Sequence, residues 1–438
     1  MTLFPSDIAT SLSSIVGVEH LTLLSKLSGA KQDQILAALQ PSVYDPVVVY
    51  PRDQAELAAV VTRAHEQQWR LLICGHRSKL SWGQPAADID VVISTQWLNR
   101  VIDHAAGDLT VTVEAGVPLA ALQTILAAEN QFVALDPAYA DHATIGGIIA
   151  TQDSGSLRHR YGGVRDMVLG VTFVRADGQI TKAGGRVVKN VAGYDLMKLL
   201  TGSFGTLGIM TQVTLRLYPK PEQGATLLFC GNTAEIEATS RTLINSTLTP
   251  TAVELLTPQF LAPYDLEGEV GLAVRFQGLP ESVEAQCLLL AQQSLIPSVT
   301  QQGDQDTTFW QTFQSQFWLE APVICKVGVL PAKIVSVLQR MKESAQEEAV
   351  DLQGQFHAGS GLGLLRLEGE TTAKLIETLR THCQHEQGFL TVLEAPSELK
   401  TQIDVWGYQG NALESMRKLK EQFDPLALLN PGRFVKKL

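Results

Sequence analysis

The sequence is poor in cysteine, in long apolar runs and in basic charge, and each shortage excludes a class of protein. Its 438 residues include five cysteines, which are widely spaced and form no CxxC pair. This argues against a disulfide framework, a zinc site or an iron–sulfur cluster. No stretch approaches the length of a membrane span, and the N-terminus lacks the basic segment and apolar core of a signal peptide. The net charge of −11 disfavours nucleic acid and anionic membrane surfaces as partners. We therefore expect a cytoplasmic protein that meets a membrane only through a partner.

Two common nucleotide-binding motifs are also missing. No GxGxxG stands between a strand and a helix with an acidic residue about twenty positions later, which disfavours a Rossmann-type NAD site. Nothing matches GxxxxGK[ST], and the glycines of GSFGTLG at 202–208 are spaced differently from either motif.

Glycine is abundant instead, between residues 136 and 219, where glycine-rich turns alternate with apolar strands. Glycine tolerates positive φ and lets bare N–H groups approach anionic oxygens closely. A long ligand touched by many separate turns fits this pattern better than one phosphate loop does. The region therefore predicts a site for a large dinucleotide such as FAD. Its glycines are Gly146, Gly147, Gly155, Gly162, Gly163, Gly184, Gly185, Gly193, Gly202, Gly205 and Gly208.

The pattern along the chain predicts an α+β protein with two main domains. Residues 1–40 are expected to form short helices, because LTLLSKL (21–27) and QILAALQ (34–40) have helical apolar spacing. Strand and helix patterns alternate over 41–220, as in a nucleotide-type domain. Residues 221–400 predict a second domain with an antiparallel sheet backed by helices. The remainder, 401–438, is read as a helix followed by a turn.

Two glycine-containing segments are candidates for contact with the ligand. The loop from Gly75 to Lys79 follows a strand and could offer successive N–H groups to a diphosphate, with Arg77 or Lys79 as the counter-charge. Alone this signal is weak, because glycine and serine are frequent at such junctions. The pair Gly146-Gly147 could form a backbone wall against a flat ring, or could mark tight packing between elements.

Two residues are candidates for catalysis. His357 stands at a strand end, where it is either a packing or surface residue or a substrate-side general base. Arg160 is either a solvated surface charge or part of an anionic pocket. No group of residues predicts a metal site.

The motifs RYGGVRDMVLGV, VVKNVAGYDLMKL and TGSFGTLGI together resemble the GlcE-type FAD-binding subunit of glycolate oxidase, also called glycolate dehydrogenase. That group lies within the fold shared by vanillyl-alcohol oxidase and para-cresol methylhydroxylase (PCMH). The resemblance covers 41–220, and the tail NPGRF is expected to return to the same domain. It implies an α+β protein in which a PCMH-type two-part FAD-binding domain (41–220 with 401–438) carries a cap domain (221–400).

The resemblance also implies which residues hold FAD. The FAD pyrophosphate would be bound by the loop residues Gly75, His76, Arg77, Ser78 and Lys79. The pyrophosphate and isoalloxazine would be lined by Pro137, Thr144, Gly146, Gly147, Ser154 and Gly155. Backbone contacts to the cofactor would come from Gly205, Gly208 and Ile209, and the site would be closed near the ring by Asn430 and Arg433.

The chain departs from this family in two places. His76 and Arg77 stand where relatives have small residues, and Arg77 replaces the histidine that some relatives bond to the flavin, so we expect non-covalent FAD. The stretch His357-Ala-Gly-Ser-Gly-Leu-Gly-Leu lacks the acidic residue and second histidine of the related His-x-Gly-Asp-Gly-Asn-x-His motif, whose histidines serve metal and substrate.

The resemblance implies a subunit that works with a sister flavoprotein and an iron–sulfur subunit to oxidise glycolate to glyoxylate. Two alternatives stay open, a self-sufficient FAD-dependent D-2-hydroxy-acid dehydrogenase acting on D-lactate or glycolate, and a non-catalytic scaffold subunit.

Overall fold

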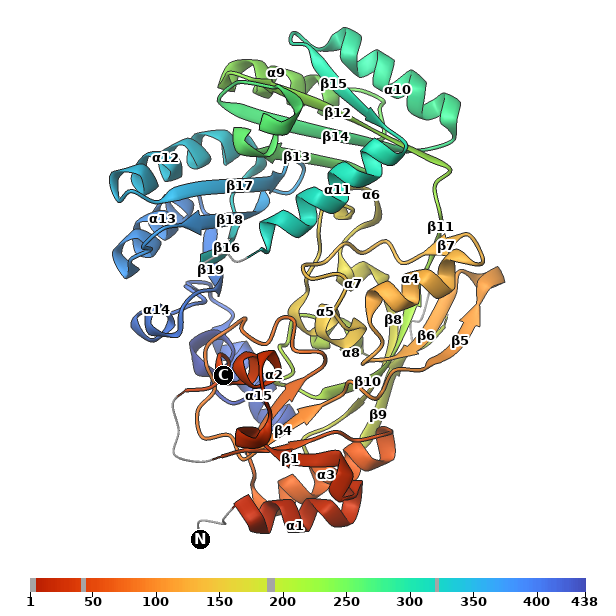
Figure 1. The fold of residues 1–438 in the computed structure, drawn as a ribbon, viewed down its shortest axis with the longest axis vertical. Coiled ribbons are helices and arrows are strands. Elements are labelled where there is room, and N and C mark those ends of the chain that lie inside the picture. Colours follow the sequence, from red (N-terminus) through yellow and green to blue (C-terminus); the bar gives the residue numbers. More distant parts are fainter. Residues whose placement is uncertain (1–4, 41–44, 187–193, 320–322) are drawn as a thin grey trace. The chain divides into compact units, whose positions relative to one another are not determined.

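The computed structural model describes residues 5–40, 45–186, 194–319 and 323–438 (Figure 1). The chain divides into two compact units. The first comprises Met1–Ser154, Gly163–Pro219 and Tyr408–Leu438, and the second comprises Gly155–Gly162 and Lys220–Gly407. The C-terminal residues therefore return to the first unit. The segment Gly155–Gly162 belongs to the second unit although its neighbours on both sides belong to the first.

The first unit contains a small, mainly parallel sheet near the N-terminus. Its strand order is β1-β2-β4-β3, in which β2 and β3 run parallel to β4 and β1 is antiparallel to β2. The strands are β1 (Leu21–Leu23), β2 (Val47–Val49), β3 (Leu71–Cys74) and β4 (Val91–Ser94). Helix α3 (Gln54–Gln67) connects β2 to β3.

The residues of α3 account for where the helix begins and which face it buries. The Asp53 side chain accepts hydrogen bonds from the Ala55 and Glu56 N–H groups and so caps the first turn. Leu57, Val60 and Val61 share one face and are fully buried, which stabilises the packing by roughly 1.5–3 kcal/mol for each side chain.

A five-stranded antiparallel sheet forms the other half of the first unit, with strand order β5-β6-β10-β8-β9. Its strands are β5 (Val101–Ala105), β6 (Thr110–Glu114), β8 (Val168–Val174), β9 (Ile180–Gly184) and β10 (Ile209–Arg216). A two-stranded ribbon pairs β7 (Gln131–Phe132) with β11 (Tyr218–Pro219). Besides α3, the α-helices of this unit among the described residues are α1 (Pro5–Val16), α2 (Ala30–Leu36), α4 (Leu119–Ala127), α5 (Ile145–Thr151), α7 (Val164–Met167), α8 (Leu196–Leu200) and α15 (Leu413–Phe423).

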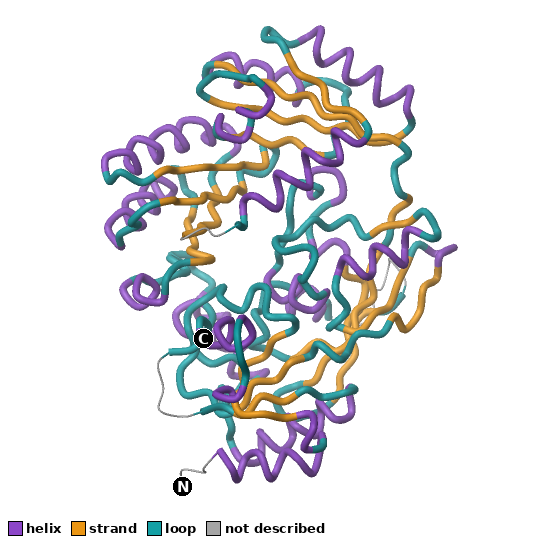
Figure 2. Tube along the Cα trace, viewed as in Figure 1, coloured by secondary structure: helices purple, strands orange, loops and turns teal. Residues whose placement is uncertain are grey.

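The second unit is built on one eight-stranded antiparallel sheet with order β15-β12-β14-β13-β17-β18-β16-β19. Figure 2 shows strands in orange and helices in purple. Its strands are β12 (Gln223–Gly231), β13 (Ala252–Leu256), β14 (Val270–Gly278), β15 (Ser298–Gln302), β16 (Val323–Gly328), β17 (Asp351–His357), β18 (Leu362–Glu368) and β19 (Phe389–Glu394). Its helices are α6 (Arg158–Tyr161), α9 (Thr233–Ile244), α10 (Pro280–Gln293), α11 (Asp304–Phe317), α12 (Ile334–Glu347), α13 (Ala373–His385) and α14 (Ser397–Gln402). The predicted antiparallel sheet with helices is confirmed.

One local prediction is wrong. Residues 21–27 form strand β1 and a 3-10 turn (Leu24–Lys26) instead of a helix. The Leu24 N–H donates to the Pro46 carbonyl, and β1 pairs with β2. Pairing with an available strand edge therefore overrides the helical spacing of the leucines.

No helix in the described ranges has both the length and the apolar character needed to span a membrane. Part of the motif VVKNVAGYD, residues 187–193, lies outside the described residues.

Candidate functional site

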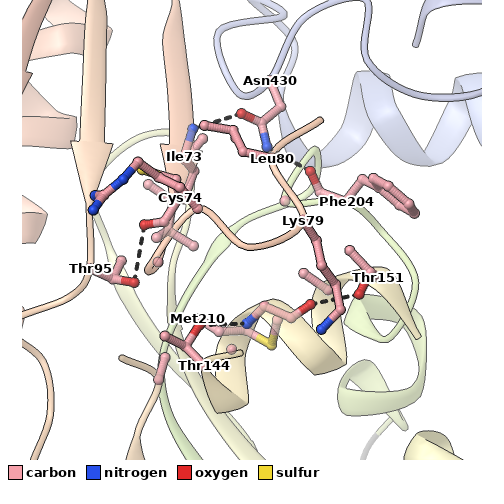
Figure 3. Close-up of a pocket in the computed structure, with 18 of the residues that line it drawn as sticks. Ile73, Cys74, Lys79, Leu80, Thr95, Thr144, Thr151, Phe204, Met210 and Asn430 are labelled. Carbon is pink, nitrogen blue, oxygen red and sulfur yellow. Dashed lines mark hydrogen bonds between the residues drawn. The ribbon is translucent and has the colours of Figure 1, made fainter. Parts of the chain in front are cut away.

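A cavity of the first unit opens where β3 ends. It encloses about 750 Å³, counting the solvent at its open mouth. Its walls come from the loop after β3, from α5, from the turn before β10 and from the C-terminal turn (Figure 3). The lining residues are Ile73, Cys74, Gly75, His76, Arg77, Ser78, Lys79, Leu80, Thr95, Ala115, Thr144, Gly146, Gly147, Ala150, Thr151, Phe204, Gly205, Gly208, Ile209, Met210, Asn430 and Arg433.

The loop after β3 presents unused backbone donors. Within the described part of the chain, the N–H groups of residues 76–79 donate to no acceptor, whereas those of Leu80 and Trp82 close turns onto Arg77 and Lys79. Arg77 has a φ of 68°, which bends the loop locally. Consecutive free N–H groups on a bent loop are typical of an anion-binding concavity.

Gly75 lets this loop approach α5. A Cβ at this position would lie 2.4 Å from the Thr144 Oγ1 atom, and that hydroxyl caps α5 by accepting from the Gly147 N–H at 3.2 Å. Any larger residue would therefore displace either the loop or the capped helix start.

The C-terminal turn fixes two other walls through Asn430. Its Oδ1 atom accepts from the Ile73 N–H at 2.8 Å, and its Nδ2 atom donates to the Phe204 carbonyl at 2.6 Å (Figure 3). The neighbouring Gly205 has a φ of 69°, and a Cβ there would lie 2.7 Å from Nδ2. The amide thus ties the end of β3 to the turn before β10.

Arg433 holds the loop after β3 through hydrogen bonds to backbone carbonyls. Its guanidinium donates to the carbonyls of Ala38, Leu80 and Trp82 at 3.1, 2.7 and 2.5 Å. Burial lowers its pKa to about 10, which still leaves the group charged at neutral pH. These contacts make Arg433 a support of the loop that contains Lys79.

The charge of the lining is one-sided. Arg77, Lys79 and Arg433 carry the positive charges, and none of the described residues that line the cavity is a carboxylate. Burial, and then the nearby Arg77 and His142, lower the pKa of His76. A cavity of this composition, with free N–H groups, suits the two phosphates of a dinucleotide, and it fits FAD in this respect.

Most of the residues predicted to hold FAD line this cavity. Pro137, Ser154 and Gly155 do not. The Ser154 hydroxyl accepts from the Val164 N–H at 3.0 Å, and Gly155 belongs to the second unit. The lining residues that sequence reasoning missed are Ile73, Cys74, Leu80, Thr95, Ala115, Ala150, Thr151, Phe204 and Met210. Thr95 could have been predicted from the sequence, because it directly follows β4. Since β4 runs parallel to β3, the two strands end at the same edge of the sheet.

The second unit holds a cluster of two histidines and a serine around the predicted His357. The His159 Nδ1 atom lies 2.9 Å from the His357 Nε2 atom, and the Ser360 Oγ atom lies 2.6 Å from His357 Nδ1. The two rings meet edge to face with centroids 5.1 Å apart. Gly359 leaves room for both rings, because a Cβ there would lie 3.3–3.5 Å from them.

Both ring nitrogens of His357 are therefore engaged, and the side chain is buried. Burial, then His159 and Arg158, lower its pKa to about 3, and burial lowers the pKa of His159. The outer nitrogen, His159 Nε2, has no hydrogen-bond partner among the residues described. Sequence reasoning missed His159, which stands 198 positions from His357. Arg160, on α6, is exposed.

Comparison with known sequences also indicates FAD as the ligand. Residues 46–184 match the FAD binding domain family, and residues 406–434 match the C-terminal domain of FAD linked oxidases. A D-lactate dehydrogenase of Archaeoglobus fulgidus is 29% identical, over 90% of this chain and 92% of that protein. Glycolate oxidase subunit GlcD of Bacillus subtilis is 27% identical, over 89% of each chain. Glycolate oxidase subunit GlcE of Escherichia coli is 25% identical, over 86% of this chain and 96% of that subunit.

Comparison with solved structures supports the same fold. The 4-ethylphenol oxidase of Gulosibacter chungangensis and p-cresol methylhydroxylase each superpose with a TM-score of 0.76 at 14% identity, over 98% of this chain and 96% of theirs. At that identity the match shows the fold alone. The chain therefore has the PCMH-type fold, and it is similar in sequence to FAD-linked oxidoreductases over most of its length.

Proposed function

We propose that this chain is the FAD-binding subunit of a glycolate dehydrogenase-type complex, which oxidises glycolate to glyoxylate and passes electrons to a sister flavoprotein and an iron–sulfur subunit. The observation that carries the proposal is the cavity at the end of β3, with free N–H groups and no carboxylate in its described lining. Similarity to the E. coli glycolate oxidase subunit along 96% of that subunit's length supports the assignment.

In this proposal the first unit binds the cofactor without a covalent bond. The N–H groups of residues 76–79 hold the diphosphate, with Lys79 and Arg77 supplying charge, and Asn430 and Arg433 keep the loop in place. FAD, when bound, supplies a two-electron acceptor that can pass electrons on singly. Arg77 stands where some relatives have a flavin-linked histidine, and we expect acid precipitation to release the flavin into the supernatant. Flavin that stays with the precipitate would contradict this.

The histidine cluster suits the handling of a substrate proton. A neutral His357 can donate from Nε2 to His159 Nδ1 while Ser360 donates to His357 Nδ1. In the opposite pair of neutral tautomers, His357 donates from Nδ1 to Ser360 and His159 donates from Nδ1 to His357 Nε2, which leaves His159 Nε2 as an acceptor. Under this proposal His159, with His357 behind it, is the group that takes the hydroxyl proton of a 2-hydroxy acid. Arg160, which is on the same short helix, stays a candidate for pairing with the carboxylate.

The proposal is tested with the reconstituted three-subunit complex. A Gly75→Val variant of this chain should lose FAD, because its Cβ would collide with Thr144. We expect the complex to assemble but glycolate oxidation to collapse. A complex that lacks FAD in this subunit and still oxidises glycolate at the normal rate would support the scaffold alternative instead.

A second candidate function is a self-sufficient FAD-dependent D-2-hydroxy-acid dehydrogenase. The similarity to an archaeal D-lactate dehydrogenase over nine-tenths of this chain favours it. It predicts that the isolated chain reduces an artificial acceptor with D-lactate or glycolate, whereas the subunit proposal predicts that full activity needs the partners.

The subunit proposal also includes a cytoplasmic location, with membrane contact only through the partner subunits.

A further inference from the structure

Lys79 is a buried cation in the lining of the cavity. The side chain is 4% exposed, and its Nζ atom makes no hydrogen bond of good geometry within the described residues. Figure 3 shows it reaching from the loop after β3 toward the end of α5, near Thr151. A lysine buried this deeply requires a nearby anion if it is to stay charged.

The anion nearest to Lys79 is Asp153, which does not line the cavity. The Asp153 Oδ2 atom lies 3.1 Å from Nζ, and the same oxygen accepts from the Ala138 N–H at 2.8 Å. Burial lowers the pKa of Lys79, and the negative charge of Asp153 opposes that effect. Asp153 therefore helps Lys79 to keep its proton, while one of its oxygens serves a second donor.

The other cations of the lining have partners of their own. Arg433 donates to three carbonyls, and Arg77 donates to the Gln96 side chain at 3.3 Å. Lys79 instead forms an ion pair, with a carboxylate that lies outside the lining. In a protein with a net charge of −11, a cavity lining without carboxylates that contains such a lysine is suited to an anionic ligand.

We propose that Asp153 is an internal substitute for the anionic cofactor, and that the diphosphate of FAD replaces it as the principal partner of Lys79. The inference rests on the FAD-binding part of the proposed function and on no step of substrate oxidation. Binding of the dinucleotide then exchanges one ion pair for another, so Asp153 weakens FAD binding while Lys79 strengthens it. A purely structural ion pair would not give these opposite signs.

The test is a titration of the flavin-free full-length chain with FAD, and separately with riboflavin, which has no phosphate. Lys79→Met should weaken FAD binding by about 10- to 100-fold, the range expected for loss of a charged contact to phosphate. Asp153→Asn should tighten FAD binding by roughly 3- to 10-fold, because the flavin-free state loses the competing anion. Neither change should alter riboflavin affinity appreciably.

The controls separate this exchange from general effects. Lys182→Met removes an exposed lysine on β9 and should leave FAD affinity unchanged. In the Lys79→Met background, Asp153→Asn should no longer tighten binding. If Asp153→Asn does not fold, as judged by circular dichroism, Asp153→Ser removes the charge and keeps an oxygen acceptor for Ala138.

Two results would overturn the inference: unchanged FAD affinity in Lys79→Met, or weaker FAD affinity once the Asp153 charge is removed. Failure of the wild-type chain to bind FAD would also overturn it. Because binding alone is measured, a chain that binds FAD with these signs but never oxidises glycolate would support the inference while contradicting the proposed function.

Discussion

Single residues set the shape of the cavity, and Gly205 is one of them. It has a left-handed φ of 69°, and a Cβ would lie 2.7 Å from the amide of Asn430. The same amide joins Ile73 to Phe204. Side-chain volume at this position would therefore disturb both the backbone and the hydrogen bonds that hold two walls together.

We predict that Gly205→Ala destabilises the protein by about 2 kcal/mol and weakens FAD binding. Urea unfolding and FAD titration measure the two effects. Gly107→Ala is the matched control, since its φ is not left-handed and no atom lies within 4 Å of the added Cβ. Equal stability of the two variants would show that the Asn430 contact does not constrain residue 205.

His357 gives the fold a predictable dependence on pH. Its pKa is lowered to about 3 in the folded protein, chiefly by burial, whereas an unfolded histidine titrates near 6.5. Below about pH 6.5 the unfolded chain therefore binds a proton that the folded chain does not. Stability is lost as the pH falls from about 6.5 toward 3, by at most about 1.4 kcal/mol per pH unit for this one group.

We expect His357→Gln to lose less stability than the wild type between pH 7 and pH 5, as measured by urea midpoints. His385→Gln, at the exposed end of α13, serves as the control and should behave like the wild type. Parallel pH profiles for His357→Gln and the wild type would mean that the ring is protonated in the fold.

At the scale of elements, the C-terminal turn holds the loop after β3 in place. Lys420 donates to the Thr206 and Leu429 carbonyls at 2.9 Å and to the Asp424 carboxylate at 2.6 Å. Arg433 then reaches the loop through the Leu80 and Trp82 carbonyls. The turn is therefore a structural part of the cavity, although it lies more than 350 residues from the loop in sequence.

We predict that Arg433→Lys lowers FAD affinity and costs about 2–4 kcal/mol of stability, because one ammonium group cannot reproduce the planar fork across three carbonyls. Thermal unfolding and FAD titration check both effects. Arg417→Lys changes an exposed arginine of α15 and should be neutral. If Arg433→Lys is also neutral, the turn does not determine the position of the loop.

Sequence reasoning reached those parts of the fold that local chemistry specifies. The strand before Gly75, the glycine turns and the antiparallel sheet of the second unit all have short-range signals. Residues 21–27 were misread because the partner strand β2 begins at Val47, outside their helical pattern. His159 and Asp153 could not be foreseen, since each acts through a contact made only in three dimensions: His159 with His357, and Asp153 with Lys79.

At the scale of the whole molecule, the distribution of charge is more informative than its sum. The chain is acidic overall, yet the described lining of the cavity at the end of β3 contains no carboxylate. An anionic cofactor therefore meets a local field opposite to that of the protein surface. The chain also passes between its two units more than once, because Gly155–Gly162 belongs to the second unit and Tyr408–Leu438 to the first.

The central claim is that this chain binds FAD for the oxidation of a 2-hydroxy acid. The most direct test is the visible absorption spectrum of the purified chain after reconstitution with FAD, recorded before and after anaerobic addition of glycolate with the partner subunits present. We predict flavin bands that stay with the protein through gel filtration and bleach when glycolate is added. A chain that retains no flavin, or whose flavin stays oxidised with all partners present, would contradict the claim.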